Sequence, residues 1–173
     1  RETMGSSTAL PTATPVPLTL TGTAILDLNG YDATVSNISI SVNTSTIIDN
    51  DTASDPVSGT FAGKPEGMVF TTGAVTTQIT YQGGDGNDVV LTTLSATDPE
   101  LEGTPGGDTF VVRKNGANVE VVLNGNVIYT AALATVDSLS LNGLGGNDTF
   151  TVDFGFGGYF TLPGGLDLLG SDG

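Results

Sequence analysis

The chain has 173 residues, with four Lys and Arg against 19 Asp and Glu, so its formal net charge is −15. Four cations cannot neutralise a nucleic-acid backbone or bind an anionic lipid surface, so we expect no nucleic-acid partner and no membrane insertion. His and Cys are absent, which excludes Ser-His-Asp and Cys-His catalysis, His/Cys zinc sites and disulfides. The 25 glycines, with many Thr, Val, Asn and Asp, favour strands and tight turns. We therefore predict an all-β protein.

The chain is predicted to consist of two β-rich modules with flanking segments of different composition. Residues 1–19 are rich in Pro and Thr and are predicted to form a linker, or an arm that donates a strand to a neighbouring sheet. Residues 20–94 form the first predicted module, and residues 95–102 form a polar joint. The second module covers residues 103–173 and ends within a further turn, so we expect the chain to be a piece of a longer polypeptide.

Three short strands are predicted in the second module, at about residues 109–131. They are separated by Asn115-Gly116 and Asn124-Gly125, dipeptides that favour two-residue hairpin turns. The spacing therefore predicts an antiparallel meander in this region.

One glycine-rich turn recurs along both modules. It is written Gly83-Gly84-Asp85-Gly86-Asn87-Asp88, then again at 103–108 and 143–148, with a degenerate fourth copy that includes Asp172. The closing aspartates are 20, 40 and 24 residues apart. A step of about 20 residues is typical of one rung of a β-solenoid, such as a parallel β-helix or β-roll. We therefore predict a β-solenoid with a skipped rung at Asn124-Gly125-Asn126, and two β-sandwich modules are the alternative, because hairpins suit both.

The residue types in this turn suit a hard cation. Glycine exposes backbone carbonyls and the Asp adds carboxylate oxygens, so stacked turns would supply the oxygen ligands that Ca²⁺ prefers. Asp88 and Asp108 are the best predicted pair, since they are one short step apart. The other interpretation is that each Asp bonds the backbone of its own turn. The predicted calcium ligands are Gly83, Gly84, Asp85, Gly86, Asn87, Asp88, Gly106, Asp108, Gly145, Asn147, Asp148 and Asp172.

The copy at residues 83–91 matches the nonapeptide G-G-x-G-x-D-x-U-x at each defined position, and the next two copies lack its second glycine. These copies resemble the RTX, or haemolysin-type, calcium-binding repeats of secreted bacterial proteins. In that family the nonapeptides run in tandem, whereas ordinary strands separate them here. The runs 46–91 and 107–149 also resemble blocks of autotransporter-like passengers and giant repetitive bacterial surface proteins. That resemblance implies a secreted, cell-surface protein with a β-rich stalk and an adhesive or surface-layer role.

The leading functional hypothesis is a non-catalytic, extracellular structural or adhesive module, stabilised by Ca²⁺, of a bacterial surface protein or filament. Its expected partners are neighbouring repeats, copies of itself joined by strand addition into a homopolymer, and surface polysaccharide. No catalytic residue is assigned. One alternative is a calcium-dependent β-helical enzyme that acts on polysaccharides, with carboxylates paired as Asp85/Asp88 or Asp137/Asp153. The other is a passive secretion or folding module attached to a different functional domain.

Overall fold

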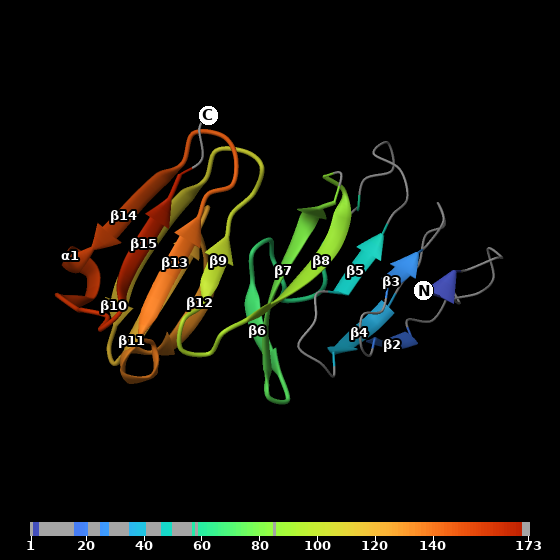
Figure 1. Cartoon of the computed structure of the whole chain (residues 1–173), viewed down its shortest axis with the longest axis horizontal. Coiled ribbons are helices and arrows are strands. Elements are labelled where there is room, and N and C mark those ends of the chain that lie inside the picture. The colour runs from blue at the N-terminus through green and yellow to red at the C-terminus, as the bar shows by residue number, and fades with distance from the viewer. Residues whose placement is uncertain are drawn as a thin grey trace. The chain divides into compact units, whose positions relative to one another are not determined.

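The computed structural model describes Val57 and residues 59–84 and 86–170, together with the backbone of five strands nearer the N-terminus (Figure 1). The described part is mostly β, which confirms the all-β prediction. Its helical elements are the four-residue α1 (Phe154–Gly157) and the 3₁₀ turn η1 (Leu133–Thr135). The strands up to residue 94 are β1 (Glu2–Thr3), β2 (Val16–Leu20), β3 (Ile25–Asp27), β4 (Val35–Ile40), β5 (Thr46–Asp49), β6 (Val69–Thr72), β7 (Val75–Gly83) and β8 (Asp88–Leu94).

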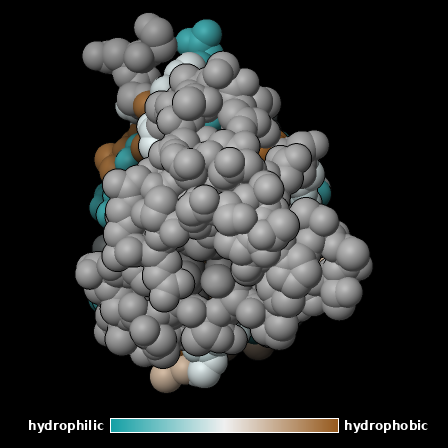
Figure 2. All heavy atoms as spheres, turned by 90° about the vertical axis from the view of Figure 1, so that its right-hand side faces the viewer, coloured by the Kyte–Doolittle hydropathy of each residue, from teal (hydrophilic) through white to brown (hydrophobic). Residues whose placement is uncertain are grey.

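The chain divides into two compact units. Unit 1 comprises Arg1–Thr60 and Thr71–Thr93, and unit 2 comprises Phe61–Phe70 and Leu94–Gly173. Residues 95–102, predicted as a joint, lie in unit 2 and supply β9 (Glu100–Glu102), whose Leu101 is fully buried. On the face shown in Figure 2, described residues appear at the margins, where hydrophobic and hydrophilic groups lie next to one another.

Unit 1 contains parallel and antiparallel pairs. The six-stranded sheet has the order β1-β3-β5-β8-β7-β6, in which β3 and β5 are parallel and β5 and β8 are antiparallel. A second, two-stranded sheet pairs β2 with β4 in parallel, so the end of the predicted linker or arm pairs within its own chain. Ile79 and Leu91 on β7 and β8 are each 1% exposed, and they form part of the apolar core of this unit.

Unit 2 has two sheets. The four-stranded sheet has the order β12-β11-β10-β14 and the three-stranded sheet has the order β15-β13-β9. The strands are β10 (Thr109–Asn115), β11 (Asn118–Leu123), β12 (Asn126–Ala132), β13 (Ser138–Asn142), β14 (Thr149–Asp153) and β15 (Gly165–Leu169). β10, β11 and β12 pair antiparallel in succession, which confirms the predicted meander and its two Asn-Gly turns.

The two sheets of unit 2 share one apolar core. Phe110 and Val121 from the four-stranded sheet and Leu101, Leu139 and Leu141 from the three-stranded sheet belong to a single cluster of buried side chains. The arrangement is sandwich-like, as in the alternative prediction. Strand alternation explains it, because every second residue of β10 and β13 points into this core.

The parallel pairs in unit 2 join residues 40 positions apart. Glu100 lies opposite Ser140 in the β9–β13 pair, and Thr109 lies opposite Thr149 in the β10–β14 pair. The predicted step of about 20 residues is therefore wrong for this unit. Its reason is the hairpin: Asn124-Gly125, predicted as the turn of a skipped rung, connects β11 to β12 instead. The hairpin lengthens the path from one parallel strand to the next.

Candidate functional site: stacked glycine–aspartate turns

The turns at 103–108 and 143–148 occupy equivalent places in unit 2. Each connects a strand of the three-stranded sheet to a strand of the four-stranded sheet, β9 to β10 and β13 to β14. Backbone hydrogen bonds join the two levels, from Gly103 N to Asn142 O and from Thr149 N to Asp108 O, each 2.8 Å long. The parallel register of the flanking strands thus continues through the turns.

Asp108 has hydrogen-bond donors on both carboxylate oxygens. Oδ2 accepts the backbone N–H of Thr104 at 2.6 Å, and the Thr104 hydroxyl lies 3.1 Å from both oxygens. Oδ1 also accepts from Asn124 Nδ2 at 2.6 Å. With Asp108 only 2% exposed, these bonds compensate for the loss of water around the buried carboxylate. The side chain closes its own turn, as the second interpretation of the sequence proposed.

Asp148 is bonded differently. Its Oδ1 accepts the backbone N–H of Asp108 at 3.0 Å, so its carboxylate links the two turns. Its Oδ2 is buried and has no hydrogen-bond partner in the described part of the chain. The cause is residue 144: it is Leu where the first turn has Thr104, and its N–H donates to Asn142 Oδ1 at 3.1 Å instead. Leu144 also has a left-handed φ of 66°.

The glycines of these turns allow backbone to pack on backbone. A Cβ on Gly145 would lie 2.8 Å from the carbonyl oxygen of Pro105, and a Cβ on Gly107 would lie 2.8 Å from that of Asn147. Gly146 combines a φ of +88° with contacts to the backbone of Gly106 and Gly107. A side chain at any of these positions would push the two levels apart, so glycine is needed for stacking as well as for turning.

The remaining copy, at residues 83–88, belongs to unit 1. Gly86 N donates to Gly83 O at 2.8 Å, and Asp88 is buried at the start of β8. A Cβ on Gly84, whose φ is +58°, would collide with the Asp88 carboxylate. Asp85 lies outside the described residues. The carboxylate therefore folds back over its own turn here too.

The predicted pairing of Asp88 with Asp108 is replaced by a different pairing. The carboxylate that bonds to Asp108 is that of Asp148, 40 residues further along, while Asp88 lies in the other unit. Asp172 lies outside the described residues. In the parallel register, Leu169 corresponds to Asn142, so counting along the sequence aligns Asp172 with Gly145 rather than with Asp148.

The described donor set does not make a calcium cage at the two stacked turns. Ca²⁺ takes six to eight oxygen ligands. Both oxygens of Asp108 already have protein donors, and only Asp148 Oδ2 has none. Among the residues that the structure describes, no group of three or more acidic side chains is arranged to hold a metal ion. Asn147 is exposed, and the metal-ligand role of the predicted residues stays a prediction.

Two residues of this site were not among the predicted ligands. Thr104 supplies an N–H and a hydroxyl to Asp108, and Asn124 supplies its amide. Asn124 also accepts the N–H of Thr109 at 2.9 Å while taking the left-handed φ of 50° that its hairpin turn needs. The Asn-Gly dipeptide announced the turn, but nothing in the sequence showed that its side chain reaches Asp108.

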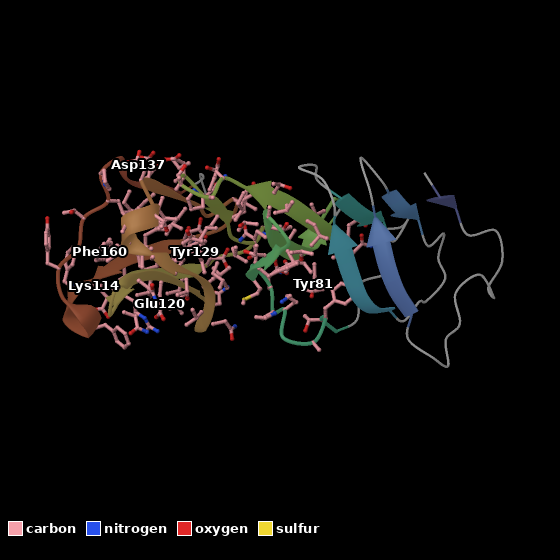
Figure 3. All side chains as sticks on the ribbon, turned by 90° about the horizontal axis from the view of Figure 1, so that it is seen from below. Tyr81, Lys114, Glu120, Tyr129, Asp137 and Phe160 are labelled. Atoms are coloured by element: carbon pink, nitrogen blue, oxygen red, sulfur yellow. The ribbon has the colours of Figure 1, made fainter. Side chains whose placement is uncertain are left out.

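A second polar cluster lies on the outer face of the four-stranded sheet. Glu120 accepts from Asn115 Nδ2 at 2.7 Å and from Arg113 Nε at 3.0 Å, and the Arg113 guanidinium lies 4.0 Å from the ring centre of Phe156. The hydrogen bond from Asn115, with that from Arg113, holds the pKa of Glu120 below its ordinary value, although burial acts in the opposite direction. Figure 3 shows Lys114 and Phe160 at the same end of unit 2. This cluster anchors α1 against β10.

Comparisons of the chain with family models, curated proteins and solved structures find no match. Within the described residues, no helix is long and apolar enough to cross a membrane.

Proposed function

We propose that the chain is a non-catalytic structural module of an extracellular bacterial surface protein or filament, in which unit 2 forms successive rungs of a β-solenoid. The observation that carries the proposal is the in-register stacking of β9, its turn and β10 on β13, its turn and β14. A rung then has 40 residues, of which β11 and β12 form an inserted hairpin.

The same contacts support a structural role for the aspartates. Asp108 is engaged by Thr104 and Asn124, and Asp153, one of the carboxylates considered for an enzyme, accepts the N–H groups of Gly155 and Phe156 and caps α1. Carboxylates used in this way stabilise turns and helix ends. The proposal therefore assigns no catalytic residue and expects neighbouring repeats, copies of the chain and surface polysaccharide as partners.

The stacking is tested by a matched pair of glycine substitutions. Gly146→Ala places a methyl group against the backbone of the turn above it, whereas Gly125→Ala, at a similar φ of +85°, meets open space. We expect Gly125→Ala to cost about 1 kcal/mol and Gly146→Ala about 1–3 kcal/mol more. Hydrogen exchange at the amides of β10 and β14 measures the difference. Equal losses in the two variants would refute the stacked turns as the stabilising element.

Calcium enters the proposal at the 83–88 turn, whose sequence matches the calcium-binding nonapeptide at each defined position. The chain carries 19 carboxylates against four cations, so a bound divalent cation would also reduce their mutual repulsion. Thermal unfolding followed by circular dichroism, in EDTA and in millimolar Ca²⁺, tests this. At a hundredfold excess over Kd, Ca²⁺ would stabilise by about 2.7 kcal/mol. The rise in Tm should disappear in Asp88→Asn and persist in Asp148→Asn, and an absent rise would remove calcium from the proposal.

A further inference from the structure

Exposed apolar side chains concentrate at one end of unit 2. Of the six large hydrophobic residues that are exposed among the described ones, five lie between residues 154 and 169: Phe154, Phe156, Tyr159, Leu168 and Leu169. Tyr159 is 73% exposed. We call β14, residues 154–164 and β15 the open end of unit 2; in Figure 1, β14 and α1 lie on the side of unit 2 away from β9 and β12.

The open end interrupts an apolar ladder that is otherwise buried. Leu101, Leu141 and Leu168 occupy equivalent inward positions on β9, β13 and β15, as the parallel registers show. Leu101 and Leu141 are 0% exposed, whereas Leu168 is 41% exposed. The first level of the stack is therefore covered and the last level is not. Such an end is the place where a repeat protein needs a cap or a further layer.

The backbone of β15 is also available for pairing. In the part of the chain that the structure describes, β15 pairs only with β13 and lies at the edge of its sheet. The unpaired N–H and C=O groups of an edge strand are a template for another strand. Leu166 and Leu168 face the core side, while Asp167 lies between them on the other face.

We infer that the open end is an interface for a second copy of this chain, in which the two β15 strands pair antiparallel about a two-fold axis at Asp167. The inference rests on the proposed structural function and names its partner. Continuity with the β13–β15 sheet carries it: the symmetric register places Leu166 opposite Leu168 of the second copy and so extends the apolar face of the sheet. An isologous two-fold contact is also the commonest way for identical chains to associate.

Asp167 makes this association depend on salt. In the symmetric register the two Asp167 carboxylates face each other, and like charges directly opposite destabilise a strand pair. Each copy also carries a net charge of −15, so repulsion is long-range at low ionic strength. We expect monomers in low salt with EDTA and dimers at high ionic strength. Replacing Asp167 by Ser, the residue at the equivalent position of β13, should lower the dimer Kd in low salt about fivefold.

Cross-linking through an introduced cysteine tests the register, because the chain contains no Cys. Asp167→Cys places each thiol opposite its own copy, within the distance over which a disulfide forms. The matched control is Glu100→Cys: Glu100 and Asp167 lie on opposite sides of the same residue, Ser140. In high salt under mild oxidation, we expect a covalent dimer of Asp167→Cys and a monomer of Glu100→Cys. Equal cross-linking of both variants would overturn the inference.

Sedimentation of the full chain supplies the second measurement. Asp167→Ser should dimerise more tightly than the unchanged chain, Glu100→Ser should not, and Leu168→Glu should remain monomeric at every salt concentration. Monomers throughout, with slow amide exchange in β10 and β13, would overturn the dimer and leave the stacked structure intact. Fast exchange in β10 and β13 would overturn the stack, and with it the proposed function.

Discussion

The 103–108 and 143–148 turns share their backbone pairing and their closing aspartate but differ in how that aspartate is bonded. Asp108 accepts hydrogen bonds on both oxygens from Thr104 and Asn124. Asp148 accepts the N–H of Asp108 on one oxygen and leaves the other buried without a donor in the described structure. The two levels around them differ in the same direction, since Phe110 is 0% exposed and Phe150, stacked on it at 5.3 Å, is only partly buried.

This difference teaches that the glycine–aspartate pattern sets the path of the backbone but not the energetics of the turn. The residue after the first glycine decides whether the carboxylate has a local donor, because Thr104 offers a hydroxyl and Leu144 does not. The inserted hairpin contributes the remaining donor through Asn124. Copies that look alike in sequence can therefore contribute unequally to stability.

The largest expected effect concerns the stacked aromatic pair. Phe110→Ala should lower the free energy of unfolding by about 3–5 kcal/mol, because it opens a cavity in a fully buried site. Phe150→Ala should cost about 1–2 kcal/mol, because much less of its surface is removed from water. Urea denaturation of both variants measures the comparison. Equal losses would mean that the second level is as well buried in solution as the first.

The aspartates themselves should differ by a smaller amount. Asp108→Ala leaves the Thr104 N–H and the Asn124 amide without their acceptor, so we expect a loss of about 2–4 kcal/mol. Asp148→Ala removes one hydrogen bond and one unpartnered oxygen, so we expect a loss of about 1 kcal/mol. Hydrogen exchange at the β10 amides reports both values. A greater loss in Asp148→Ala would contradict the asymmetry.

One substitution should strengthen the weaker turn. Leu144→Asn replaces a side chain that tolerates the left-handed φ of 66° poorly with one that tolerates it well, and we expect a gain of about 0.5–1 kcal/mol. The same change at the other turn, Thr104→Asn, removes the hydroxyl donor and should cost about 1 kcal/mol. Opposite shifts in Tm are the expected result; shifts of the same sign would show that the two positions are equivalent.

The smallest expected effect is a change in the acid limb of stability. The pKa of Glu120 is lowered in the folded chain, so its contribution is present above its ordinary pKa and is lost as the pH falls through the folded value. Glu120→Gln should therefore show a shallower loss of stability on acidification, by about 0.5–1 kcal/mol. Urea midpoints measured at neutral pH and near pH 3 test this. Parallel curves for both proteins would show that the Asn115 and Arg113 bonds contribute nothing.

Much of unit 2 could be predicted because its signals are local. The Asn-Gly dipeptides specify their hairpin turns through backbone conformation, and alternation specifies the buried face of β10 and β13. The step between parallel strands could not be predicted in this way. Three aspartates gave steps of 20 and 40 residues, and only the strand pairing showed that 40 is the structural one in this unit.

The sequence by itself determined the all-β class, the glycine-rich turns and the antiparallel meander, because each depends on the conformations open to a few adjacent residues. Only the tertiary structure decided that Asp108 bonds to Thr104, Asn124 and Asp148, and that Leu168 is exposed where Leu101 and Leu141 are buried. These outcomes depend on which strands become neighbours. That choice is made by the shared core of the two sheets, whose contacts join residues far apart in the chain.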